Sequence, residues 1–297
     1  MRAFEYFTAT DSKHAVALLA EHAPARVLAG GTDLLADLKS SPSHAPKTVV
    51  DISRAADMRG IEVNARGLCI GALVTHSEIM ASTVIRDLFP ALADAAHTIG
   101  AVQTRNLGTL GGNLVTAVPS VDSGPTLVAL DAQVTIAGPA GHRTMPLSEF
   151  FVAPRRTALK PDELLVEIVI PAENLGKPAH FLKMGLRKGQ ALALVNAASS
   201  LRIDAKKNTC KDVRIALGAV APTVVRAKTA EKFLEGRAAT AENFAEAGRL
   251  AVADAKPISD MRASADYRKD LVAVLAKRTL EAACAQSKAA KQKGARK

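Results

Sequence analysis

The chain has 297 residues and an apolar fraction of 48%, which is enough to bury the cores of two domains and excludes a disordered chain. Aromatic residues make up only 3% and tryptophan is absent, which disfavours a single-strand nucleic-acid binder that stacks bases on aromatic side chains. The net charge is +10, but the last eleven residues, SKAAKQKGARK, carry five basic residues and no acid. Half of the charge therefore belongs to a solvated tail.

The three cysteines, Cys69, Cys210 and Cys284, lie far apart and form no CxxC pair. This spacing predicts no disulfide framework and no zinc or iron–sulfur site, so we expect no metal in this chain. The N-terminal residues lack the apolar stretch of a signal peptide, and no segment reaches about 18 uninterrupted apolar residues. We expect a soluble, cytoplasmic protein with no membrane contact.

The first elements are a helix over residues 11–22, with an Asp/Ser cap and a buried apolar face, and a short strand within RVLAGG. Directly after this strand, TDLLADLKS offers Thr32 or Asp33 as a helix cap. The order is strand, glycine pair, helix start.

Further strands are expected at residues 48–53 and 67–75, followed by a helical stretch over 85–100 that is interrupted or begins near Pro90. The next segment, RNLGTLGGNLVT (105–116), holds three glycines among five polar side chains. AQVTIAG and DELLVEIVIP are expected to be strands, with GPAGHR as the turn between them. This first region predicts a mixed α/β domain over residues 1–175.

The pattern changes in the second region, residues 176–286. Three strands near 179–187, 193–204 and 211–220 precede three helical stretches near 226–236, 240–254 and 264–284. Strands followed by a block of helices predict a separate, smaller α+β domain with a three-stranded sheet. Residues 287–297 are expected to be a disordered basic tail.

The glycine pairs Gly30-Gly31 and Gly111-Gly112 are the strongest chemical signal. Each pair stands beside polar side chains that can donate hydrogen bonds, and glycine lets backbone N–H groups approach an anion closely. Such loops suit a diphosphate, although each pair alone is more often a tight turn. The P-loop pattern and the GxGxxG of a Rossmann turn are both absent.

Several segments in order resemble the FAD-binding medium subunit of the xanthine dehydrogenase and carbon monoxide dehydrogenase family of molybdenum hydroxylases. The resemblance runs from about residue 3 to residue 285 and is carried by AGGTDLL (29–35), QTRNLGTLGGNL (103–114), VPSVD (118–122), DELLVEIVIP (162–171), FLKMGLRKG (181–189) and SDMRASADYRKDLVAVLAKR (259–278). It implies a two-part FAD-binding domain of the PCMH/vanillyl-alcohol-oxidase type, followed by a domain like the C-terminal domain of the CO dehydrogenase flavoprotein.

The resemblance also implies which residues bind FAD. Two loops would hold its pyrophosphate, namely Ala29, Gly30, Gly31, Thr32 and Asp33 together with Thr109, Gly111, Gly112 and Asn113. Asp122 would lie near the adenosine half and Ile99 on the adenine, whereas Leu165 and Lys183 would lie close to the isoalloxazine ring. Thr116 is as consistent with a turn as with binding. Asp122 could instead cap a helix, Lys183 could be an exposed strand residue and Leu165 could belong to the core.

The function implied is that of an oxidoreductase subunit with non-covalent FAD and no catalytic side chain of its own. Its partners would be a small [2Fe-2S] subunit and a large molybdopterin subunit, in a dimer of heterotrimers, with electrons passing through FAD to NAD+ or another acceptor. One alternative is a stand-alone flavin reductase of the UDP-N-acetylenolpyruvoylglucosamine reductase type, whose catalytic motif we do not find. A second is a basic nucleic-acid-binding or scaffold protein without cofactor, which rests only on the net charge.

Overall fold

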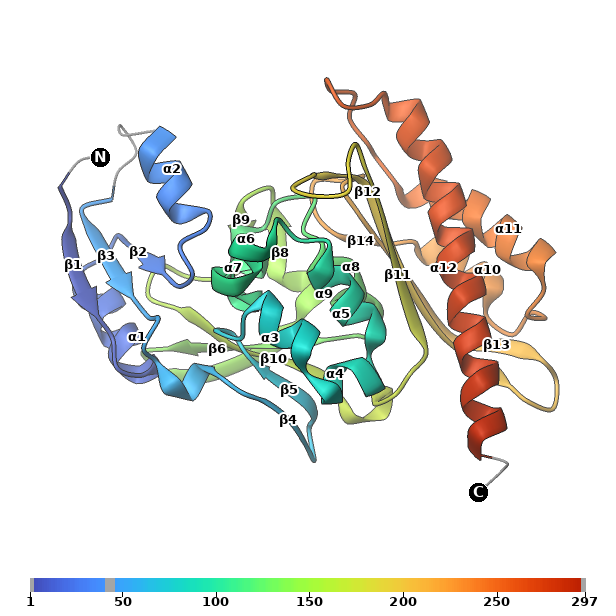
Figure 1. Cartoon of the computed structure of the whole chain (residues 1–297), viewed down its shortest axis with the longest axis horizontal. Helices are drawn as coiled ribbons and strands as arrows, with labels where there is room; N and C mark the ends of the chain where they lie inside the picture. Colours follow the sequence, from blue (N-terminus) through green and yellow to red (C-terminus); the bar gives the residue numbers. More distant parts are fainter. Residues whose placement is uncertain (1–2, 41–45, 295–297) are drawn as a thin grey trace.

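The computed structural model describes residues 3–40 and 46–294, with side chains described up to residue 289. Figure 1 shows three parts in chain order: a small N-terminal unit in blue, a central unit in green, and a C-terminal unit that ends in the long red helix.

The N-terminal unit is a three-stranded parallel sheet with the strand order β1-β3-β2 (Figure 1). Its elements are β1 (Glu5–Thr8), α1 (Ser12–Glu21), β2 (Ala25–Leu28), α2 (Leu34–Ser40) and β3 (Thr48–Asp51). Asp11 caps α1 by accepting the backbone N–H of His14 at 2.8 Å. The expected helix–strand–glycine pair–helix order is confirmed.

The central unit is built on a five-stranded antiparallel sheet, order β4-β5-β10-β6-β7. The strands are β4 (Ile61–Asn64), β5 (Gly67–Gly71), β6 (Gln133–Gly138), β7 (Gly141–Pro146) and β10 (Leu164–Pro171). The expected turn at GPAGHR is shorter than predicted. Gly138 pairs with Gly141, so only Pro139 and Ala140 form the hairpin loop and the following residues continue as β7.

The unit has several short helices, most of which pack with this sheet in one hydrophobic core. They are α3 (His76–Ala81), α4 (Thr83–Leu88), α5 (Pro90–His97), α6 (Val102–Leu107), α7 (Leu110–Thr116), α8 (Ser123–Ala129) and α9 (Leu147–Phe150). The helical stretch over 85–100 is divided at Phe89, because Pro90 begins a new helix at its first position. A small hairpin of β8 (Phe151–Ala153) and β9 (Arg156–Thr157) and the 3-10 turns η2 (Ala56–Met58) and η3 (Ala172–Asn174) complete the unit.

The C-terminal unit is an antiparallel sheet of four strands, not the three expected. They are β11 (Ala179–Gly185), β12 (Ala193–Asp204), β13 (Thr209–Gly218) and β14 (Val225–Arg226). The fourth strand has only two residues, which is too short for alternation to reveal. The helices α10 (Lys228–Leu234), α11 (Ala241–Ala251) and α12 (Ala265–Gly294) follow as expected, with η4 (Val252–Asp254) after α11.

Strand β12 is buried on both faces and joins the two larger units. On one face Ser200 donates to the carbonyl of Ala129 in α8 at 2.6 Å, and on the other Ser199 lies 2.7 Å from the hydroxyl of Thr279 in α12. Figure 1 shows the sheet standing between the central helices and α12. This position lets β12 carry side chains into the boundary between the units.

Helix α12 extends to Gly294, so the backbone of residues 287–294 is helical where a disordered tail was expected. The physical reason is composition, since alanine, lysine and glutamine are strong helix formers. Arg296 and Lys297 lie outside the described residues. Within the described ranges, no helix is both long and apolar enough to cross a membrane.

Candidate functional site

The first diglycine loop, Ala29–Asp33, joins β2 to α2. Gly31 has a φ of +72°, which only glycine adopts freely, and this residue turns the chain from the strand into the helix. Among the described residues, no hydrogen-bond acceptor is found for the backbone N–H groups of residues 30–34. The loop therefore presents a run of open donors.

The second diglycine loop forms the start of α7 and is fixed by hydrogen bonds to the chain segment that precedes α3. Leu110 and Gly111 donate their backbone N–H groups to the carbonyls of Val74 and Ala72, at 2.8 and 2.9 Å. The N–H of Gly112 is taken by the hydroxyl oxygen of Thr109 at 3.0 Å. The backbone N–H groups of Leu110, Gly111, Gly112 and Asn113 are thus used within the fold. Among the described residues, the polar groups left in this loop are the Thr109 N–H and the side chains.

The two loops lie against each other although they are far apart in the chain. A methyl group built on Gly30 would lie 1.8 Å from the carbonyl oxygen of Leu107, so glycine alone permits this approach. Thr116 Oγ1 lies 3.1 Å from a carboxylate oxygen of Asp33 and 2.8 Å from the Gly112 carbonyl. The structure thereby brings together the two loops predicted to hold a pyrophosphate.

The donor set at this junction fits a diphosphate. The open N–H groups of the first loop stand beside the hydroxyl of Thr32, which lies next to Gly108 of the second loop. Asn113 accepts from the hydroxyl of Ser123 at 2.6 Å through its oxygen, which leaves its NH2 group as a donor. Backbone donors and neutral side chains of this kind bind phosphate oxygens without a metal ion.

Asp122 and Lys183 form one buried ion pair, whereas the sequence resemblance assigned them to opposite ends of the cofactor. The Lys183 Nζ lies 2.5 Å from Asp122 Oδ2 and also donates to the carbonyl of Thr98 at 3.0 Å. Each of the two side chains is only 8% exposed. Burial raises the pKa of Asp122, and the nearby ammonium opposes this rise. Asp122 precedes α8 but makes no capping hydrogen bond.

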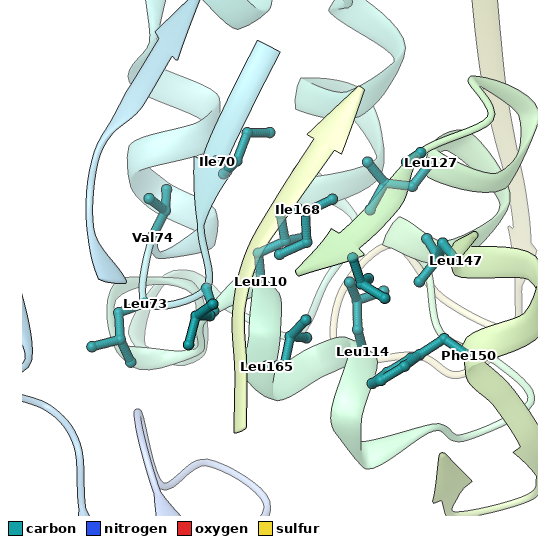
Figure 2. Close-up of a cluster of buried hydrophobic side chains, with 14 of the residues drawn as sticks. Ile70, Leu73, Val74, Leu110, Leu114, Leu127, Leu147, Phe150, Leu165 and Ile168 are labelled. Atoms are coloured by element: carbon teal, nitrogen blue, oxygen red, sulfur yellow. The ribbon is translucent and has the colours of Figure 1, made fainter. Parts of the chain in front are cut away.

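Leu165 belongs to the hydrophobic core. Its side chain is 2% exposed, and Figure 2 shows it beside Leu110 and Leu114 of α7, whose first turn carries the second glycine pair. Ile99 ends the turn after α5, and its carbonyl accepts from Arg105 at 2.9 Å. Arg105 therefore organises the loop, as does Asn106, which accepts from Ser77 at 2.5 Å.

Two residues of the site were not predicted from the sequence. His76, the first residue of α3, is 1% exposed, and its backbone N–H donates to the carbonyl of Gly108 at 3.1 Å. Burial, with a smaller effect from Arg105, lowers its pKa to about 4. Asn196 of β12 is fully buried and donates to Asp122 Oδ1 at 2.8 Å. A lone histidine and a lone asparagine carry no pattern that would have identified them.

Within residues 3–40 and 46–289, no three His, Cys, Asp or Glu side chains converge on a point where they could hold a metal ion. The polar groups that the structure does bring together, open backbone N–H donors and one buried ion pair, suit anion binding and charge placement.

Comparison with known proteins gives consistent matches along most of the chain. A family model described as the FAD binding domain in molybdopterin dehydrogenase matches residues 2–173, and the CO dehydrogenase flavoprotein C-terminal domain matches residues 180–283. The carbon monoxide dehydrogenase medium chain of Hydrogenophaga pseudoflava is 34% identical over 284 residues, covering 95% of this chain and 98% of that one. The xanthine dehydrogenase FAD-binding subunit of Escherichia coli O157:H7 is 31% identical, with 94% and 96% covered.

The fold agrees with these matches. The solved structure of the Hydrogenophaga pseudoflava carbon monoxide dehydrogenase that lacks the Mo-pyranopterin moiety superposes with a TM-score of 0.91 at 34% identity, covering 96% of this chain and 98% of that chain. Sequence, domain order and fold together show that this chain belongs to the family of FAD-binding medium subunits of xanthine dehydrogenase and carbon monoxide dehydrogenase type molybdenum hydroxylases.

Proposed function

We propose that this chain is the electron-transferring subunit of a molybdenum-containing hydroxylase or dehydrogenase complex and binds FAD non-covalently between its two diglycine loops. The observation that carries the proposal is the contact of Gly30 with Leu107, which joins the open donors of Ala29–Asp33 to the side chains of Thr109–Asn113. A binding pocket assembled from two distant loops needs such a contact, and a simple turn does not.

Each part of the site has a separate task in this proposal. The N–H groups of residues 30–34 and the Thr32 hydroxyl bind diphosphate oxygens, and the Asn113 amide adds a donor from the second loop. The Asp33 carboxylate accepts a hydrogen bond from Thr116, and this bond would limit the repulsion between the carboxylate and the phosphates. When bound, FAD supplies the redox chemistry, and the chain supplies orientation and electrostatics.

The other residues predicted to contact FAD, Asp122, Lys183 and Leu165, also have a place in the proposal. The Asp122–Lys183 pair would face the cofactor from the boundary between residues 1–175, the FAD-binding domain, and residues 176–286, the C-terminal domain. Leu165 would contribute through its backbone, since its side chain points into the core. No side chain of the chain is assigned a catalytic step.

The complex would be cytoplasmic, and its other chains would hold the remaining cofactors. We assign the [2Fe-2S] clusters to a small partner subunit and molybdopterin to a large one, in a dimer of heterotrimers, with NAD+ or another acceptor taking the electrons from FAD. Support comes from relatives that are named as medium chains or subunits of dehydrogenases.

Titration of the purified full chain with FAD tests the proposal. We expect binding of one FAD per chain, with a change in the flavin absorption spectrum, and a chain that binds no FAD contradicts the proposal. The decisive variant is Gly112→Val, because a Cβ at this position meets only the Thr109 hydroxyl, at 2.9 Å, so the side chain has few contacts with the fold but removes the close approach that glycine offers an anion. We expect at least a tenfold weaker affinity.

A matched control introduces the same side chain where no binding is proposed. Ala17 is exposed in the middle of α1, so Ala17→Val tests the effect of a valine in a helix away from the loops. Affinity for FAD should stay at the wild-type value in this control. Equal affinity of Gly112→Val and Ala17→Val would mean that the second glycine pair is an ordinary turn.

A further inference from the structure

Three residues lie side by side across three strands at the boundary between the two larger units. Lys183 of β11 is the direct partner of Asn196 in β12, and Asn196 is in turn the partner of Gly218 in β13. Side chains that are opposite each other on antiparallel strands point to the same face of a sheet. Here that face is turned toward Asp122, at the start of α8.

Together the two strand residues take both oxygens of one carboxylate. Lys183 binds Oδ2 of Asp122 at 2.5 Å and Asn196 binds Oδ1 at 2.8 Å. A buried ion pair is stable only if its remaining hydrogen-bonding groups are also satisfied. The Asn196 amide meets that need for the carboxylate, and the Thr98 carbonyl meets it for the ammonium.

Gly218 makes the orientation of Asn196 possible. A Cβ built at position 218 would lie 2.1 Å from Asn196 Oδ1, so a larger residue would displace the amide. Within the described residues this Oδ1 is buried and has no donor. Turning the amide over would place an oxygen against the Asp122 carboxylate, so the NH2 group must face Asp122. Asn196 thus leaves one polar atom unpaired in order to hold Asp122.

We propose that Asn196 is a positioning residue that keeps Asp122 in its ion pair with Lys183, so that the C-terminal domain presents a neutral pair, not a free lysine charge, to the bound FAD. This inference rests on the proposed function, because it requires the cofactor to lie within electrostatic reach of Lys183. It assigns to Asn196 and Gly218 a role in setting the redox behaviour of the site.

The charge balance predicts the direction of each effect. Reduction adds negative charge to FAD, so an uncompensated ammonium nearby favours the reduced form and makes the midpoint potential more positive. Asp122→Asn removes the compensating charge directly. Asn196→Leu removes the amide that stabilises the carboxylate, so Asp122 takes up a proton more readily and the ammonium is again uncompensated.

The experiment measures the FAD midpoint potential by spectroelectrochemistry on the full chain reconstituted with FAD, together with the affinity for FAD. We expect Asp122→Asn and Asn196→Leu to shift the potential in the positive direction. Gly218→Ala, on the neighbouring strand, should also shift the potential in the positive direction, because its methyl group displaces the Asn196 amide although residue 196 itself is not substituted. Circular dichroism and the thermal midpoint show whether each variant is folded.

Two further variants separate positioning from packing. Asn174 is also buried, and its amide donates to the Leu130 carbonyl at 3.0 Å without touching Asp122, so Asn174→Leu should leave the potential unchanged. The double variant Asp122→Asn with Asn196→Asp moves the carboxylate from α8 to β12, still beside Lys183, and should return the potential toward the wild-type value. A purely structural role of Asn196 would give no such rescue.

The outcomes are distinguishable. Failure of the wild-type chain to bind FAD contradicts the proposed function itself. Normal binding with a potential that none of the variants changes overturns the present inference and leaves the proposed function intact. The inference is also overturned if the midpoint potential shifts only in Asp122→Asn, while Asn196→Leu and Gly218→Ala are folded and keep the wild-type potential. If Asn196→Leu does not fold, Gly218→Ala and the double variant decide.

Discussion

Asp33 and Thr116 are 83 positions apart in the chain, and a hydrogen bond of 3.1 Å between their side chains joins the two diglycine loops. Asp33 ends the first loop and Thr116 ends α7, the helix that contains the second glycine pair, so this contact holds α7 against the first loop. Its loss would let the loops separate without disturbing either glycine pair.

Replacing Thr116 with valine tests this contact. Valine keeps the shape of threonine but loses the bonds to Asp33 and to the Gly112 carbonyl, which together contribute about 0.5–1.5 kcal/mol. We expect the dissociation constant for FAD to rise about two- to tenfold in a fluorescence titration. Thr135→Val is the control, since its hydroxyl bonds Glu167 in the central sheet, and an equal loss of affinity there would refute the specific role of Thr116.

The contact between Gly30 and Leu107 predicts a much larger effect of one methyl group. In Gly30→Ala the new Cβ would overlap the Leu107 carbonyl oxygen at 1.8 Å, and backbone atoms must move to relieve this overlap. We expect the free energy of unfolding to fall by about 1–3 kcal/mol, as in other overpacked sites, with at least tenfold weaker FAD binding. The measurements are urea denaturation and FAD titration.

Gly112→Ala is the matched comparison for this prediction. There the new Cβ meets only the Thr109 hydroxyl, so the loss is limited to the capping bond, about 1 kcal/mol. If both alanine variants unfold at the same urea concentration, the close approach of the two loops does not stabilise the fold.

Local patterns revealed the elements around the first glycine pair but not helix α7, which contains the second pair. The run of apolar residues before Gly30 and the break at Pro90 each depend on neighbouring residues, and the structure confirms them. Helix α2 begins at Leu34, but among the described residues neither Thr32 nor Asp33 makes the expected capping hydrogen bond, and Asp33 accepts from Thr116 instead. By contrast, helix α6 was not predicted from the sequence. None of its residues is buried, so its sequence shows no apolar periodicity. The two-residue strands were missed for lack of length.

The hydrogen bonds and ion pairs between side chains of the site could not be predicted from local patterns. Lys183 meets Asp122 across 61 positions, and Asn196 meets it across 74, through the pairing of strands that belong to a different unit. No periodicity in the chain encodes which strand residue faces which loop. The sequence therefore indicated residue types that suit a cofactor, and the fold determined which of them act together.

The three cysteines provide a prediction that follows from burial. All three are free and buried, and burial raises the pKa of each thiol, that of Cys210 to about 12. We expect none of them to react quickly with Ellman's reagent at pH 8 in the folded chain, and three to react after unfolding in guanidinium. A fast-reacting thiol in the native chain would contradict the burial of Cys69 in β5, Cys210 in β13 or Cys284 in α12.

His76 predicts how stability depends on pH. Its pKa is lowered from 6.5 to about 4 by burial, so the folded chain binds the proton less tightly than the unfolded chain. The stabilisation is complete above pH 6.5 and is lost as the pH falls through about 4, with a total of about 3 kcal/mol. We expect wild type to lose about 2–3 kcal/mol more than His76→Gln between pH 7 and 4.5 in urea denaturation, because glutamine stays neutral throughout.

His97, exposed at the end of α5, provides the control: His97→Gln should follow the wild-type curve. Parallel curves for wild type and His76→Gln would show that the imidazole is not buried as a neutral group beneath Gly108.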